Sequence, residues 1–149
     1  MNQSSVQKYI NVMQKWFDQL PSLPTNARDV IVKVTPILAV IFGILGILGE
    51  VSALSAMTAS GLFMIPRGIY GMGYLGYNYL SMILWLIGDI LLLSAYWGTK
   101  QRKISGWNKL FWSEVLYFLG SIFSFELIPG LIGVVIAFYF LFQIKSYYK

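Results

Sequence analysis

The chain has no cysteine and no histidine among its 149 residues, and only 11% of its residues are charged. Without these two residue types there is no disulfide, no thiol nucleophile, no histidine acid–base catalyst and no Cys/His metal site. We therefore expect no catalytic residues, no metal and no cofactor. A soluble domain usually has about 25% charged residues, so this chain is too apolar to cover a surface in water.

The hydrophobic residues, 57% of the chain, are concentrated in four long apolar runs. A spanning helix needs roughly 20 such residues, and each run is about that long. The sequence predicts an all-α fold, in which residues 1–149 form a single membrane domain and four spans make a four-helix bundle. The predicted spans cover about residues 34–57, 79–97, 107–125 and 127–144. Residues 58–78, rich in Gly and Tyr, are expected to be a flexible or re-entrant outer loop.

The segment 4–20 precedes the first span and is more polar. Its apolar residues recur at helical spacing, which is typical of a helix with one apolar face. We expect an amphipathic helix lying in the membrane interface, and the alternative is a helix packed on a partner protein. The apolar face comprises Val6, Tyr9, Ile10, Met13, Trp16, Phe17 and Leu20.

The basic residues predict the orientation of these spans. Of the 11 Lys and Arg residues, all except Arg67 fall in the N-terminal segment, the loop between the second and third spans, or the C-terminal tail. Because Lys and Arg accumulate in cytoplasmic segments, both termini should be cytoplasmic. Topology thus explains the net charge of +5, and no nucleic-acid partner is expected.

Small residues at helical spacing predict where the helices meet. Within lipid, helices associate through close packing and polar contacts, because lipid already satisfies apolar side chains. The predicted packing positions are Gly43, Gly46, Gly88, Gly120, Gly130 and Gly133.

Asp89 and Glu114 are the acidic residues deepest in the predicted spans. Asp89 lies eight residues before Trp97 and Glu114 seven residues after Trp107, so both should sit about 10–12 Å from the inner boundary. The two carboxyls could face each other, with Tyr117 as a hydrogen-bond donor one turn away. One hypothesis is a proton or cation site, and the other is a hydrogen-bonded pair that fixes the helix register.

A second set of charges is expected near the outer surface. Glu50 is sixteen residues beyond Val34, about 24 Å along the first span, and Glu126 begins the outer hairpin. Arg67 is the one cation predicted on that side. It could pair with either acid, and the alternative is ordinary solvated charge, which we favour for Glu126.

Two stretches carry a family resemblance: "SGWNKLFWSE" (105–114) and "LFQIKSYYK" (141–149). They resemble segments of small, uncharacterised four-span proteins of bacteria. The resemblance implies a bacterial cytoplasmic (inner) membrane and no known activity.

The expected function is that of a non-enzymatic integral membrane protein with a structural, accessory or interaction role. Its expected partners are the lipid bilayer and either a second copy of the chain or another membrane protein. The alternative is a small proton- or cation-coupled transporter or channel that uses the intramembrane carboxylates.

Overall fold

The computed structural model describes the backbone of residues 3–64 and 68–149 and the side chains of residues 7–59 and 76–149. All elements in these residues are helical, which confirms the predicted all-α class over the described chain. They are α1 (Gln3–Phe17), α2 (Thr25–Met64), α3 (Gly68–Ser94), α4 (Tyr96–Lys100), α5 (Ile104–Phe123), α6 (Leu127–Ile144) and the 3-10 helix η2 (Lys145–Tyr147).

Three helical segments of the described chain are long and apolar enough to cross a membrane: Thr25–Ala59, Gly76–Lys100 and Leu127–Tyr147. Such lengths are typical of membrane proteins. The remaining long helix, α5, is not among them, and Asn108, Lys109 and Glu114 lie within its 20 residues.

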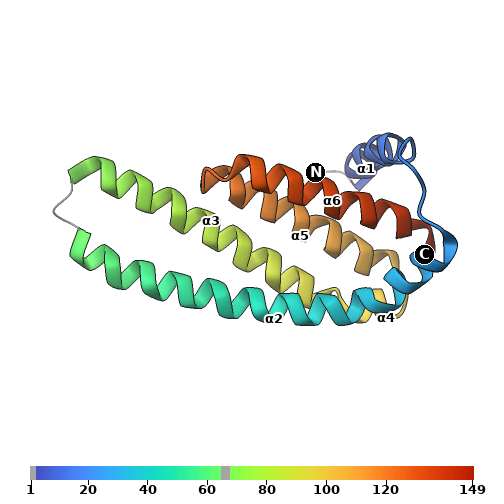
Figure 1. Cartoon of the computed structure of the whole chain (residues 1–149), viewed down its shortest axis with the longest axis horizontal. Coiled ribbons are helices and arrows are strands. Elements are labelled where there is room, and N and C mark those ends of the chain that lie inside the picture. Colours follow the sequence, from blue (N-terminus) through green and yellow to red (C-terminus); the bar gives the residue numbers. More distant parts are fainter. Residues whose placement is uncertain (1–2, 65–67) are drawn as a thin grey trace.

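The long helices form a curved row in the order α2, α3, α5, α6. Each packs on the next, whereas α2 and α6, which would close a bundle, have few contacts with each other. Figure 1 shows α2 and α3 extending beyond the shorter α5 and α6. The row leaves one face open between its two outer helices.

The helix boundaries correct the prediction for residues 58–78. The structure continues α2 to Met64 and begins α3 at Gly68, so most of the predicted outer loop is helical. At 1.5 Å per residue, the 40 residues of α2 measure about 60 Å, twice the thickness of a hydrocarbon core. Hydropathy locates the membrane-spanning part of a helix but not its ends, because a helix can continue into water.

Helix α1 packs on the side of α6 (Figure 1). Ile10 is buried, and the Phe17 ring stacks on Phe142 at a centroid distance of 5.0 Å. Tyr9 and Trp16, which were predicted on the same apolar face, are 71% and 70% exposed. The apolar stripe of α1 is therefore divided, with one part on α6 and the other facing outward.

Aromatic side chains fill the core where α1, α5 and α6 meet. The Trp107 ring is fully buried and stacks on Phe111, whose ring stacks in turn on Phe138. The Trp107 indole N–H donates to the Leu141 carbonyl at 2.8 Å, which ties α5 to α6. The chain end is fixed nearby, because the Lys149 N–H donates to the Arg102 carbonyl.

Replacing Trp107 with Phe should destabilise the fold. The change removes a buried donor, leaves the Leu141 carbonyl without this hydrogen bond and opens a small cavity, at a cost of about 1–3 kcal/mol. We expect a lower midpoint of thermal unfolding in detergent. The matched control is Trp97→Phe, because Trp97 is 65% exposed. Equal midpoints for the two variants would contradict the anchoring role of Trp107.

Candidate functional site

Asp89 is buried inside the row of helices, with 4% of its surface exposed. The Tyr117 hydroxyl on α5 donates a 2.6 Å hydrogen bond to its Oδ1 atom. A buried carboxylate is costly unless it is hydrogen-bonded, so this contact stabilises Asp89 and joins α3 to α5. The structure thus brings together Asp89 and Tyr117, two of the three predicted candidates, and the predicted pairing of Asp89 with Glu114 stays a prediction.

Helix α2 approaches the same carboxylate through its glycines. A methyl group added at Gly46 would overlap the Asp89 carboxylate, and one at Gly43 would lie 3.2 Å from the Asp89 carbonyl oxygen. Residues three apart share one face of a helix. These two positions therefore let the backbone of α2 rest directly on α3 at the level of Asp89.

Three of the other predicted packing glycines also lie at close helix contacts. A methyl group at Gly88 would lie 2.9 Å from the Tyr117 ring, and one at Gly120 would overlap the Trp85 indole. The Trp85 N–H donates to the Tyr117 carbonyl at 2.9 Å, so the Tyr117 residue is held at both its backbone and its hydroxyl. Gly130 similarly faces Ser121.

The sixth glycine corrects the packing prediction. A methyl group at Gly133 would meet no atom within 4 Å, because this position borders a small cavity of about 170 Å³ that lies between α6 and α5. Spacing within one helix cannot distinguish a glycine that faces a partner from one that faces open space.

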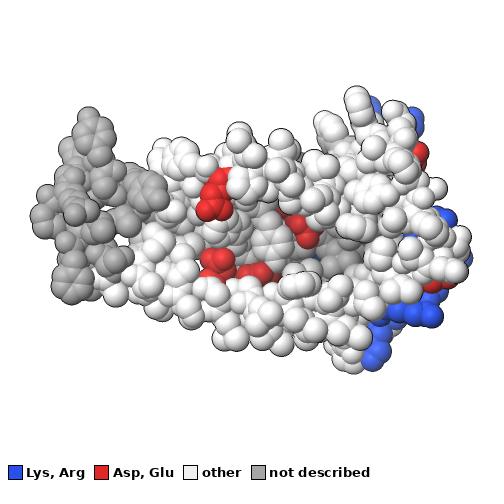
Figure 2. Space-filling model, viewed as in Figure 1, with Lys and Arg blue, Asp and Glu red and all other residues white. Residues whose placement is uncertain are grey.

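The open face of the helix row carries a groove of about 560 Å³ between α2 and α6. Its walls are apolar, with Leu38 and Phe42 on α2 and Phe140 and Leu141 on α6, and Leu92 of α3 also lines it. Figure 2 shows acidic atoms around a hollow in the middle of the molecule, whereas the basic atoms lie at one end. The groove thus combines an apolar surface with nearby negative charge.

Glu114 and Tyr117 bring polar atoms to this groove, and both also border the 170 Å³ cavity beside it. Within the described residues, no side chain is hydrogen-bonded to the Glu114 carboxylate. Lys109, one turn earlier on α5, points elsewhere, because its ammonium donates to the Ser94 carbonyl at 3.0 Å. Glu114 therefore faces the groove, and in the described part of the chain no Lys or Arg side chain lines the groove beside it.

The structure places Glu50 close to Asp89 along the packed helices α2 and α3. Glu50 is one turn beyond Gly46, which contacts Asp89, so it lies near Asp89, and its predicted position near the outer membrane surface stays a prediction. The prediction took the first span to end at about residue 57, but α2 continues for about 20 Å past Glu50. One Glu50 oxygen, Oε2, is buried without a partner in the described chain.

The other predicted outer charges are only partly described. Glu126 is exposed just before α6, which agrees with a solvated charge. Arg67 lies outside the described residues, so its predicted pairs with Glu50 and Glu126 stay predictions.

Sequence reasoning missed the groove itself. Its walls are formed by ordinary Leu, Ile and Phe residues of α2 and α6, whose pattern does not differ from that of lipid-facing residues. No signal in one helix tells whether the helix next to it in space is close or distant. Glu114 and Tyr117 are the exceptions, because a polar group in an apolar run is visible in the sequence.

No family model, curated protein or solved structure matches this chain. The resemblance of residues 105–114 and 141–149 to small bacterial membrane proteins stays a prediction. In the part of the chain that the structure describes, no group of three or more acidic side chains is placed to hold a metal ion.

Replacing Gly46 with Ala should destabilise the protein, because the new methyl group would displace the Asp89 carboxylate or push α2 away from α3. Overpacking of this kind costs about 1–3 kcal/mol. Gly49→Ala is the matched control, since a methyl group at Gly49 would meet nothing within 4 Å. Thermal unfolding in detergent measures the difference.

A double-mutant cycle makes the cause specific. In an Asp89→Ala background the carboxylate is absent, so adding Gly46→Ala should cost less than it does in the wild type. If Gly46→Ala lowered the stability equally in both backgrounds, its effect would not come from contact with the Asp89 carboxylate.

Proposed function

We propose that α2, α3, α5 and α6 all cross a bacterial cytoplasmic membrane, with both chain termini in the cytoplasm. Support comes from the position of α5 between α3 and α6 and from its 20 residues, which measure about 30 Å. The basic residues at one end of the molecule (Figure 2) fit the cytoplasmic side. Helix α1, with Tyr9 and Trp16 facing outward, would then lie in the cytoplasmic interface.

Within this arrangement we propose that the protein is a non-enzymatic binding module, which takes a hydrophobic cation from the bilayer into the groove between α2 and α6. The observation that carries the proposal is the position of Glu114 in an apolar groove whose described lining residues include no Lys or Arg. Intramembrane acids normally pair with another group or serve a functional site.

The shape and chemistry of the groove select the ligand class. Its volume of about 560 Å³ lies within the roughly 300–1,000 Å³ of pockets for small organic molecules. Apolar walls favour a hydrophobic body, and the carboxylate favours a positive charge, because attraction between charges is strong where water is scarce. A lipid chain could fill the walls, but it has no donor or charge for Glu114.

Tetraphenylphosphonium, a hydrophobic cation without donors, is a suitable probe. The purified full chain in detergent should bind it more tightly than triphenylphosphine oxide, a neutral molecule of related shape. Glu114→Gln should weaken binding by about tenfold or more, since a lost charge contact of about 1.4 kcal/mol corresponds to that factor. Equilibrium dialysis with labelled probe measures both.

Glu126→Gln is the matched control, because it removes the same charge at an exposed position outside the groove. It should leave binding unchanged. Equal affinity for the neutral molecule, or equal loss in the Glu114 and Glu126 variants, would contradict the proposed site.

Proton- or cation-coupled transport is the second candidate. The observation that favours it is Glu50, which adds another carboxylate close to Asp89 and has one buried oxygen without a partner in the described chain. Uptake of the same probe into liposomes, driven by a proton gradient and reduced by Glu50→Gln, would distinguish transport from binding alone.

A further inference from the structure

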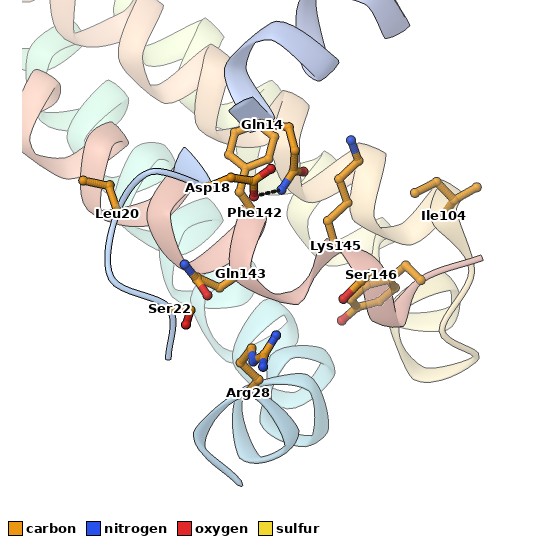
Figure 3. Close-up of a pocket in the computed structure, with 11 residues that line it drawn as sticks. Gln14, Asp18, Leu20, Ser22, Arg28, Ile104, Phe142, Gln143, Lys145 and Ser146 are labelled. Carbon is orange, nitrogen blue, oxygen red and sulfur yellow. Dashed lines mark hydrogen bonds between the residues drawn. The ribbon is translucent and has the colours of Figure 1, made fainter. Parts of the chain in front are cut away.

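A second cavity, of about 420 Å³, lies at the basic end of the molecule. It is formed where the segment after α1, the first turns of α2 and the end of α6 come together (Figure 3). Its polar lining includes Arg28, Gln143 and Lys145, which come from segments far apart in the sequence. None of these residues takes part in the groove or in the contacts around Asp89.

Arg28 brings its guanidinium group to this cavity (Figure 3). Its guanidinium Nε atom is buried and has no hydrogen-bond partner in the described chain. The guanidinium as a whole is charged and lines the cavity, so it favours a ligand that is negatively charged and accepts hydrogen bonds. A guanidinium presents five N–H donors in a planar fork, which matches the oxygens of a phosphate group.

Gln143 and Lys145 supply further donors. The Gln143 Oε1 atom accepts from the Leu23 N–H at 3.2 Å, so its NH₂ group is the end left for a ligand. The Lys145 ammonium lies 5.2 Å from the centre of the Trp107 ring, a cation–π contact that holds it in place without neutralising it. The hydroxyls of Ser22 and Ser146 also line the cavity.

The charge balance of the lining is positive. Arg28 and Lys145 give two positive charges, and Asp18 is the one acidic residue among the lining side chains. The Asp18 carboxylate already accepts a hydrogen bond from the Gln14 amide at 2.8 Å (Figure 3). The lining therefore offers one net positive charge and a surplus of donors.

We propose that this cavity binds a phosphate group, carried by the headgroup of an anionic membrane lipid or present as a free ion. Arginine with lysine is a common way to bind phosphate, through paired hydrogen bonds and charge. The cavity lies at the end of the molecule that carries the basic residues, where anionic headgroups are attracted. A bound phosphate would link α2 to α6 and to the segment that follows α1.

Binding by the purified, delipidated full chain tests the proposal. The probes are dioctanoyl phosphatidylglycerol, dioctanoyl phosphatidylcholine and inorganic phosphate, each at the same ionic strength. We expect the anionic lipid to bind more tightly than the zwitterionic one. Arg28→Gln and Lys145→Gln should each weaken the binding by about tenfold, since charged hydrogen bonds are the strong ones. Native mass spectrometry and isothermal calorimetry measure the affinities.

Lys33→Gln is the matched control, because Lys33 is an exposed cation on the same helix as Arg28 but outside the cavity. It should leave binding unchanged. Inorganic phosphate that binds tightly and is not displaced by the anionic lipid would support the site with a free ion as its ligand. Circular dichroism tests whether each variant is folded. If Arg28→Gln is unfolded, the affinity of Lys145→Gln still tests the proposal.

Two results would overturn the proposal. One is an equal loss of affinity in the Lys33 and Arg28 variants, which would indicate general attraction to surface charge. The other is the absence of measurable binding for both the anionic lipid and inorganic phosphate.

Discussion

The hydrogen bond from the Tyr117 hydroxyl to the Asp89 carboxylate joins two neighbouring helices in the apolar interior, and much of the architecture is arranged around it. A carboxylate at this depth must have a partner, and few polar groups are available among the apolar residues of the helices. The bond fixes α3 against α5, and Gly46 leaves the room that lets α2 lie over the same carboxylate. Because α6 packs on the other side of α5, the two outer helices diverge and the groove remains open.

The arrangement assigns different environments to acids that look equivalent in the sequence. Asp89 is buried and hydrogen-bonded, and its contacts are those of a residue that sets helix packing. Glu114, three residues before Tyr117 on α5, faces the groove and a small cavity instead. The proposed ligand binding rests on this division. Rigid helices hold the carboxylate, and the diverging outer helices provide the opening.

The all-α class, and the positions of Asp89 and Tyr117 on facing helices, could be predicted because polar and small residues stand out within apolar runs. The closeness of Glu50 to Asp89 could not, since it depends on which part of α2 packs on α3. Gly133 and Gly46 have the same kind of spacing, but one faces open space and the other a carboxylate. That difference depends on which helices pack against each other. The groove depends on the same packing, because its walls come from separate helices.

The central claim is that lipid-soluble molecules reach Glu114 through the groove but do not reach Asp89. Modification by the hydrophobic reagent dicyclohexylcarbodiimide, followed by mass spectrometry of peptides, tests this claim most directly, because the reagent reacts with carboxyls accessible from the bilayer. We predict an adduct on Glu114, prevented by tetraphenylphosphonium, and none on Asp89. An adduct on Asp89 with Glu114 unmodified would contradict the account.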